Sequence, residues 1–419
     1  MAERNFTQGE LQLNIAPEYL NTLDIEGFSL MLKSPSYCYK FYWLEALVHI
    51  ITEGKTETTF DEIIDEMIVD AWYSVCEFHI HLSGLVMGEA RDGLEKAINT
   101  LRELSGLAPG ASRVEIKNAI AEHNSELKKY KTQLTNMVPY RALAGFFDKG
   151  PAAVCWENRK KMTEFIRDFD TNVIKLPYVL GDSSQLNREV YIDPVWAAMI
   201  KDNAVAILGW IQYEKVRWLQ TNNPEVPGLV YKLAPMDEKM RKLSKVHDLW
   251  DGVIALTTIK DTFTGKLISG TEYDVDHFIP WSFVMNDELW NLMPMDSSLN
   301  SAKSNKLPKW DPFFRAFAGN QYKLYELINS NETIHDLYAK CLRDNLHSIW
   351  AQTELYRAGN DYNTFVNILE SNMRPLYDSA NRQGYELWQY GREAKIYSVY
   401  SKQQSAKAAS KPTEYGRKK

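Results

Sequence analysis

Residues 274–303 bring together side chains whose types and spacing suit metal-assisted hydrolysis. Asp276 and His277 are adjacent, and Asn300 and Lys303 follow on the next expected helix, one turn apart. Carboxylate and amide oxygens are ligands that Mg²⁺ accepts while it keeps several of its waters. A neutral imidazole beside such a metal can take a proton from water, and a lysine can hold a phosphate. Together these groups predict a site that hydrolyses phosphodiester bonds.

Two short strands and a helix are expected to position these side chains. Residues 273–280 form a strand-like run that ends in proline, residues 289–295 form a second run, and Asp296 offers an N-cap to the helix that follows. Neighbouring residues on a strand point to opposite faces. We expect the Ile279–Pro280 turn to bend the strand end, so that Asp276 and His277 border one cavity. Val253 to Thr258 predict one further short strand.

Three strings in this segment resemble the HNH, or ββα-metal, endonuclease motif. They are DVDHFIPWSF at 274–283, WNLMP at 290–294 and LNSAKSNKLP at 299–308. The strings are similar to the HNH module of CRISPR RNA-guided effector nucleases and of stand-alone bacterial HNH nucleases. The resemblance covers residues 274–308 and does not extend to the rest of those effectors.

The resemblance implies a role for each matching side chain. His277 matches the general base, and Asp276 and Asn300 match the metal ligands. Asn291 matches the central asparagine, which fixes the loop between strand and helix, and Lys303 matches a helix lysine near the scissile phosphate. Asp274 lies on the same strand alternation as Asp276 and is expected to support the ligands by hydrogen bonding.

The resemblance further implies Mg²⁺-dependent hydrolysis of DNA, with Mn²⁺ as a substitute, that leaves 5′-phosphate and 3′-hydroxyl ends. No cysteine pairs flank residues 251–310, so no structural zinc is expected. A bacterial anti-phage or restriction effector, regulated by its helical flanks, is one interpretation. The alternative is an inactive HNH fold that binds DNA or senses a partner in a larger nucleic-acid complex. A regulatory protein, a nucleotide and a second copy of the chain all stay open as partners.

The remainder of the chain predicts a mainly α protein with the small ββα-metal module embedded between helical regions. Capping-box patterns at Thr59/Glu62 and Ser112/Glu115, and a proline after Asp193, mark helix starts; the second box opens a helix through about Leu134. We expect five parts: an acidic helical region at 1–105, a helical region at 112–230, the HNH module at 235–312, a helical region at 313–398 and a disordered basic tail at 399–419.

Charge and composition set limits on the class of protein. Residues 1–100 hold 17 Asp and Glu against 6 Lys and Arg, and the whole chain has a formal charge of −7. An acidic chain cannot rely on global attraction to DNA, so local lysines, the metal or a partner must supply it. The polar amino terminus and the absence of long apolar stretches predict a cytoplasmic protein without a membrane span. Cys76, His79 and His81 are interpreted as core or helix-cap residues rather than as zinc ligands.

Overall fold

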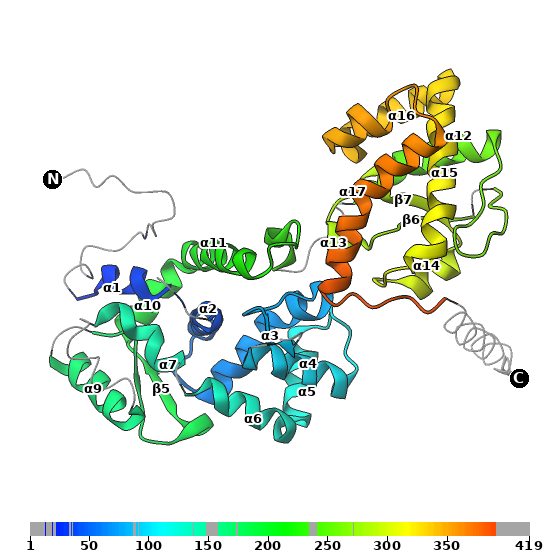
Figure 1. The fold of residues 1–419 in the computed structure, drawn as a ribbon. Helices are drawn as coiled ribbons and strands as arrows, with labels where there is room; N and C mark the ends of the chain where they lie inside the picture. The colour runs from blue at the N-terminus through cyan, green and yellow to red at the C-terminus, as the bar shows by residue number, and fades with distance from the viewer. Residues whose placement is uncertain are drawn as a thin grey trace, which may run out of the picture. The chain divides into compact units, whose positions relative to one another are not determined.

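A computed structural model describes residues 22–32, 37–86, 89–90, 92–136, 138–147, 158–172, 175–233, 241–270 and 272–390, together with residues 13, 19 and 35. The described chain is mainly helical, as predicted, with three small antiparallel sheets (Figure 1). It forms two compact units, one of residues 1–224 and 229–235 and one of residues 225–228 and 236–419. The regions expected at 1–105 and 112–230 thus fall largely in the first unit. Those at 235–312 and 313–398 fall in the second.

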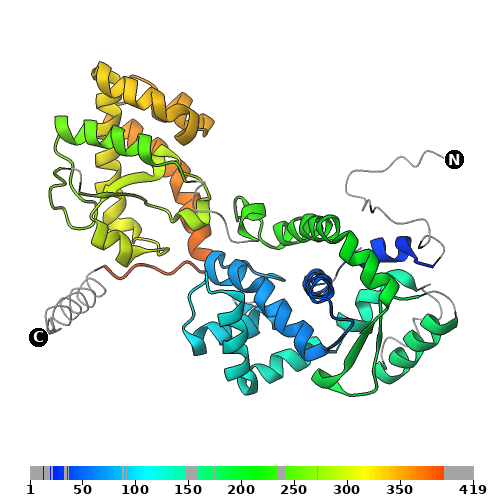
Figure 2. The same ribbon diagram turned by 180° about the vertical axis from the view of Figure 1, so that it is seen from behind.

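The first unit is built around a helix that is apolar on nearly every side. This helix, α2 (Tyr39–Thr52), buries ten of its side chains and packs against α3 and α11 (Figure 2). A helix without a continuous polar face is stable only when other elements surround it. The surrounding helices are α1 (Ile25–Ser29), α3 (Phe60–Phe78), α4 (Gly93–Ser105), α5 (Arg113–Glu122), α6 (Asn124–Leu134), α7 (Val138–Arg141), α9 (Arg159–Asn172), α10 (Pro194–Asp202) and α11 (Ala204–Asn222).

Two small sheets complete this unit. The larger has the strand order β1 (Glu57–Thr59), β5 (Glu189–Ile192) and β4 (Tyr178–Leu180), and all of its pairs are antiparallel. The smaller is the hairpin of β2 (Leu85–Val86) and β3 (Glu89–Ala90). In the larger sheet Thr59 pairs with Glu189, so the start of α3 is tied to the segment that precedes β5.

The predicted helix starts are largely present, but two long helices are interrupted. Ser112 and Glu115 form both hydrogen bonds of the capping box, whereas Thr59 caps α3 without the reciprocal bond, because the Glu62 carboxylate accepts from Thr58 instead. The helix predicted to run to Leu134 breaks at His123, and the helix that begins after Asp193 breaks at Asn203. Neither break coincides with a proline or glycine, the residues that interrupt helices most strongly.

The second unit wraps helices around one small hairpin. Its elements are α12 (Ser244–Leu256), β6 (Asp274–His277), α13 (Trp281–Val284), β7 (Leu292–Met295), α14 (Ser297–Lys303), α15 (Trp310–Ser330), α16 (Glu332–Asn345) and α17 (Tyr362–Arg382). All four residues of β7 are buried, and Phe278 packs its ring against Phe317 and Trp310 of α15. The Gln321 amide of α15 also donates to the Leu292 carbonyl at 2.6 Å. The long helix therefore holds the hairpin by apolar and polar contacts together.

The strand predicted from Val253 to Thr258 was wrong. Residues up to Leu256 continue α12, and only the last two residues of the predicted strand lie beyond it. Val246, Leu249 and Val253 recur at helical spacing and are fully buried, and α12 packs against α16. A short apolar run can belong to a strand or to a buried helix, and here the partner helix decides.

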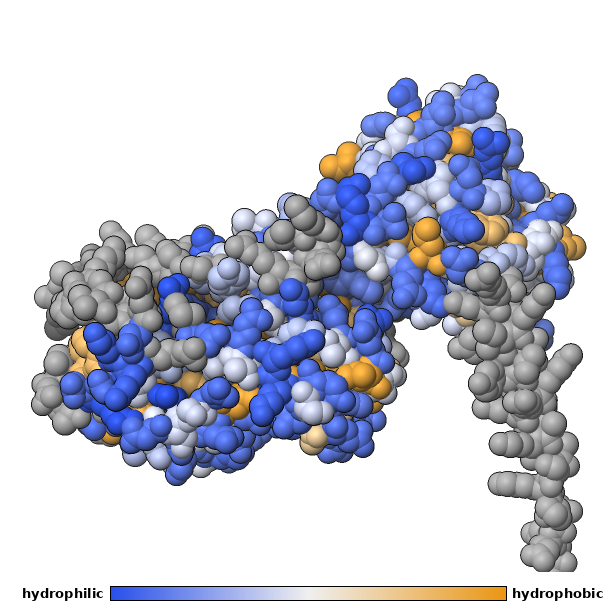
Figure 3. Space-filling model, turned by 60° about the horizontal axis from the view of Figure 1, so that its bottom comes forward, coloured by the Kyte–Doolittle hydropathy of each residue, from blue (hydrophilic) through white to orange (hydrophobic). Residues whose placement is uncertain are grey.

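The remaining predictions on this scale concern histidines, membranes and the tail. His79 is the C-cap of α3, in the left-handed conformation (φ 53°). The His81 ring nitrogen Nδ1 lies 2.9 Å from the Glu95 carboxylate, so both histidines take part in local structural contacts. Among the helices that the structure describes, none is long and apolar enough to cross a membrane. On the face drawn in Figure 3 the hydrophobic residues are scattered in small groups. The tail predicted at 399–419 lies outside the described residues.

A buried ion pair between α2 and α11 generates a stability prediction. Lys215 lies 2.6 Å from the Glu45 carboxylate, and the two side chains are 1% and 7% exposed. The change Glu45→Leu should lower the free energy of unfolding by about 3–5 kcal/mol, because it leaves a buried ammonium without its counter-charge. Adding Lys215→Met should recover most of that loss. Urea unfolding followed by circular dichroism measures both, and a single variant as stable as the wild type would contradict the prediction.

A second prediction concerns Lys232, whose side chain is fully buried. Burial lowers the pKa of Lys232 from 10.5 to about 7. Between pH 7 and 10.5 Lys232 is protonated in the unfolded chain but largely neutral in the folded chain. The contribution of this residue to the free energy of unfolding therefore rises with pH over this range. Lys232→Met should therefore stabilise the protein most below pH 7, by on the order of 5 kcal/mol. The gain should shrink towards pH 10, and a gain independent of pH in the same unfolding assay would show that the lysine is not responsible.

Candidate active site

The hairpin and the helix that follows it place Asp274, Asp276, Asn300 and Lys303 on one face, whereas His277 points to the buried side of the strand. In the ladder between β6 and β7, Asp274 pairs with Met295 and His277 pairs with Leu292. Asp296 then caps α14, because its carboxylate accepts from the backbone N–H groups of Ser298 and Leu299 at 2.9 and 3.2 Å. Alternation along β6 leaves Asp274 and Asp276 partly exposed, and α14 packs against this strand.

Asp276 is paired with the lysine of α14. The Lys303 ammonium lies 2.8 Å from Asp276 Oδ2, and the lysine side chain is 1% exposed. Burial by itself would raise the pKa of Asp276, but the Lys303 ammonium holds that pKa well below its usual range. Asp276 is therefore an ionised carboxylate, the state that a metal ligand needs.

Asn300, one turn before Lys303, reaches the other carboxylate of the strand. Its amide nitrogen donates to Asp274 Oδ2 at 3.0 Å. A carboxylate can only accept, so this bond determines which way round the amide lies. The Asn300 oxygen is therefore the atom on the opposite side of the amide from Asp274, and it is the atom that suits a hard cation. Asp274 thus orients the Asn300 amide, and its support of a metal ligand stays a prediction.

His277 contacts different groups through its two ring nitrogens. Nε2 lies 3.1 Å from the Asn286 carbonyl and 3.2 Å from Asp287 Oδ1, both of which only accept hydrogen bonds. Nδ1 lies 3.5 Å from an Arg241 nitrogen and 3.9 Å from Asp276 Oδ1. These neighbours favour the tautomer with the proton on Nε2. The basic nitrogen, Nδ1, then faces the Asp276 carboxylate, so the adjacent Asp276 and His277 do approach one another at the strand end.

Asn291 holds the loop that follows His277. Its amide oxygen accepts from the Ile279 backbone N–H at 2.9 Å, and its amide nitrogen donates to the Ile279 carbonyl at 2.8 Å. The Phe278 backbone N–H also donates to the Asn291 carbonyl, and the Asn291 side chain is fully buried. These contacts make Asn291 a positioning residue for His277, and any direct part in a reaction stays a prediction.

Two charged residues at this site were missed by the sequence analysis. Asp287 contacts His277 Nε2, and Arg241 lies beside His277 Nδ1, 3.6 Å from Asp287 and over the Trp281 ring at 5.5 Å. Burial would raise the pKa of Asp287, but His277 and Arg241 keep it lowered, so this carboxylate is also ionised. Asp287 lies in the polar stretch Asn286–Glu288, between the two strand-like runs of the sequence. No local spacing connects Arg241 with a histidine 36 positions later.

The residues present fit a metal that takes oxygen ligands. Within the described part of the chain, no three His, Cys, Asp or Glu side chains form a group that could hold a metal ion by themselves. Asp276 and the Asn300 amide oxygen would supply fewer protein ligands, all of them hard oxygens. This is the pattern expected for Mg²⁺, which keeps waters and takes further oxygens from a substrate phosphate. It does not distinguish Mg²⁺ from Mn²⁺.

Comparison with known proteins adds one match. The family model described as HNH endonuclease matches residues 260–309. No curated protein and no solved structure matches the chain. Every predicted site residue lies inside the matched segment, whereas Arg241 lies outside it. The chain therefore carries a segment of the HNH endonuclease family, embedded in a mainly helical protein.

Proposed function

We propose that this protein is a metal-dependent endonuclease that hydrolyses DNA phosphodiester bonds. The observation that carries the proposal is the position of His277 Nδ1 beside the ionised Asp276, with Asn300 and Lys303 on the facing helix. A base, two oxygen ligands and a cation for phosphate lie within one small module. The match to the HNH family supports nuclease chemistry at this module.

In the proposed reaction His277 Nδ1 takes a proton from water as that water attacks the phosphorus. The Asn286 carbonyl and the Asp287 carboxylate hold the Nε2 proton and stabilise the positive ring that results. The bond from phosphorus to the 3′ oxygen breaks, which leaves a 5′-phosphate and, once the 3′ oxygen has gained a proton, a 3′-hydroxyl. A base placed in this way contributes about 10²–10⁴-fold to a rate.

Asp276 and Asn300 would hold the metal, Mg²⁺ in this proposal. When bound, such an ion stabilises negative charge on the phosphate and on the leaving oxygen. The charges of the site agree with this need. Among the described ion pairs of this site, Asp276 is paired with Lys303 and Asp287 with Arg241, and Asp274 bonds to the neutral Asn300 amide. These three carboxylates and two cations leave a surplus of negative charge against an anionic substrate. Lys303 and Arg241 are the protein's own cations for the phosphate.

The proposed enzyme is regulated. His277 is fully buried, and Arg241 lies beside its basic nitrogen, so water and substrate reach Nδ1 only after local rearrangement. Arg241 directly follows residues 234–240, which connect the segments of the two units and lie outside the described residues. Such control suits a cytoplasmic effector of bacterial anti-phage defence or restriction.

Removal of the proposed base provides the first test. His277→Ala should reduce cleavage of plasmid DNA in Mg²⁺ by about 10²–10⁴-fold, because no other group replaces the base. His347→Ala, which changes an exposed histidine of the same unit, is the matched control and should cut normally. Circular dichroism and DNA binding in EDTA should be unchanged in both variants. An alanine variant that cuts as fast as the wild type would exclude His277 as the base. DNA binding by a wild-type protein that never cuts would favour the inactive HNH alternative.

The metal ligands provide a second, independent test. Asp276→Asn and Asn300→Ala should each raise the Mg²⁺ concentration for half-maximal cleavage by at least about 10-fold, because each removes one of few protein ligands. Calorimetric titration with Mn²⁺ should show the same loss of affinity without reference to activity. Asp336→Asn, at an exposed position on α16, is the control. Unchanged metal affinity in both ligand variants would contradict the assignment.

A further inference from the structure

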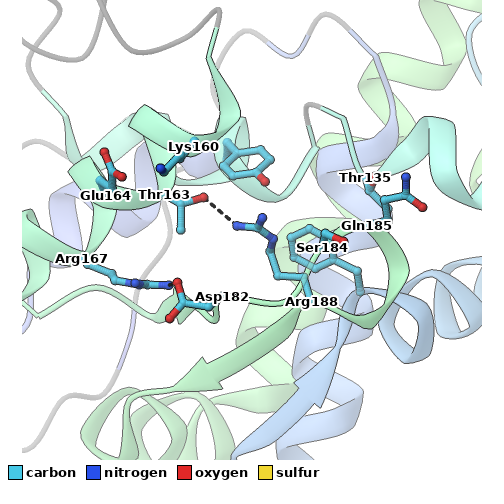
Figure 4. Close-up of a pocket in the computed structure, with 11 residues that line it drawn as sticks. Thr135, Lys160, Thr163, Glu164, Arg167, Asp182, Ser184, Gln185 and Arg188 are labelled. Carbon is cyan, nitrogen blue, oxygen red and sulfur yellow. Dashed lines mark hydrogen bonds and ion pairs between the residues drawn. The ribbon is translucent and has the colours of Figure 1, made fainter.

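The first unit contains a pocket of about 510 Å³ that the proposed nuclease reaction does not use. It is lined by side chains of α9 and of the segment that leads into β5 (Figure 4), and by Phe60 at the start of α3 and Tyr140 of α7. Its volume is within the range of pockets that bind small molecules and cofactors. The side chains around it divide into an aromatic floor and a polar rim.

The floor is formed by two buried rings. Phe60 and Tyr140 are 1% and 4% exposed, and their ring planes are perpendicular with centroids 6.4 Å apart. Both line the pocket, so a planar apolar group inside it would meet an aromatic ring at van der Waals distance. This floor suits a heterocyclic ring better than a bare inorganic ion.

The rim carries a guanidinium whose described side-chain bond is to a neutral group. Arg188 donates to the Thr163 hydroxyl at 2.7 Å, and Thr163 is 5% exposed. Arg167, in the same pocket, is instead paired with Asp182 at 2.6 Å and donates to the Leu180 carbonyl. The bond to a hydroxyl orients Arg188 without neutralising its charge. The N–H groups of the Arg188 guanidinium that do not bond to Thr163 suit a phosphate, because guanidinium groups bind phosphate through two parallel hydrogen bonds.

The backbone around Arg188 is held firmly against the aromatic floor. The Phe60 backbone N–H donates to the Arg188 carbonyl at 2.9 Å, and the next residue, Glu189, pairs with Thr59 in the sheet. Gln185 begins the turn before Arg188 with a φ of 54°, a left-handed conformation that side chains with a β-carbon rarely adopt. Strained backbone of this kind often accompanies ligand sites. The guanidinium and the rings thus form one preorganised arrangement.

The other charges of the rim permit an anion. Lys160 is an exposed cation on α9, and Asp182 is already occupied by Arg167. In Figure 4 the Glu164 carboxylate points away from Arg188, on the side to which the Lys160 ammonium is directed. The pocket is lined by three cations (Lys160, Arg167 and Arg188) and two carboxylates (Glu164 and Asp182), so it keeps a local positive charge, although the chain as a whole has a formal charge of −7.

We propose that this pocket binds a nucleotide, with the base against Phe60 and Tyr140 and the phosphate on Arg188 and Lys160. The aromatic floor, the guanidinium oriented by Thr163 and the cavity volume each match one part of such a ligand. The proposal concerns the first unit and does not depend on the nuclease activity proposed for the second.

The test is calorimetric titration of the full chain with AMP, GMP, CMP and UMP, and with adenosine and inorganic phosphate as partial ligands. We expect at least one nucleotide to bind, and to bind more tightly than either partial ligand. Arg188→Gln should weaken that binding by about 10–100-fold, the usual loss when a charged hydrogen bond is removed. Lys160→Gln at the exposed rim should weaken it about 3-fold, and added salt should weaken it as well.

Arg217→Gln, on an exposed arginine of α11, is the matched control and should bind as the wild type does. Thermal unfolding tests whether Arg188→Gln is folded. If it is not, the nucleotide affinity of Lys160→Gln decides whether the proposal holds. The proposal is overturned if no nucleotide binds or if both rim variants bind with wild-type affinity. Inorganic phosphate that binds as tightly as every nucleotide would overturn it too, since it would indicate a simple anion site.

Discussion

The antiparallel pairing of β6 with β7 is the constraint on which the candidate active site depends. It gives Asp274 and Asp276 one face, where α14 meets them through Asn300 and Lys303. It also brings Asn291, just before β7, to the loop that leaves β6, where it clamps the backbone of Ile279. Four residues of strand on each side are too few to be stable alone. The helices around the hairpin, above all α15, therefore supply the stability of the site.

Electrostatics then determines the state of each group. Buried carboxylates would ordinarily take up protons, yet the pKa values of Asp276 and Asp287 are lowered because cations lie beside both. Asp287 and the Asn286 carbonyl meet one nitrogen of His277 and leave the other for chemistry. Lys303 and Arg241 carry less positive charge than the three carboxylates of the site carry negative charge. This difference is the physical reason for proposing that a divalent metal completes the site.

Local signals predicted much of the secondary structure, but not all of it. The capping box at Ser112 and the cap at Asp296 involve residues within three positions, so the sequence contains everything they need. Whether residues 253–256 form strand or helix depends instead on the face that α16 offers to α12. The breaks at His123 and Asn203 coincide with neither proline nor glycine, and at Asn203 the side-chain amide donates to the Met199 carbonyl of the preceding helix.

The sequence alone determined which residues of the HNH segment could act and in what order their elements come. The reason is that Asp276, His277, Asn300 and Lys303 lie in a short motif whose spacing reflects strand and helix geometry. Only the tertiary structure decided what surrounds them. Arg241, 36 positions earlier, lies beside His277 Nδ1, and Asp287 contacts His277 Nε2 from a loop. The Phe60 backbone N–H donates to the Arg188 carbonyl, although the two residues are far apart in the sequence. Contacts of this kind follow from how the chain packs, and no pattern of neighbouring residues encodes them.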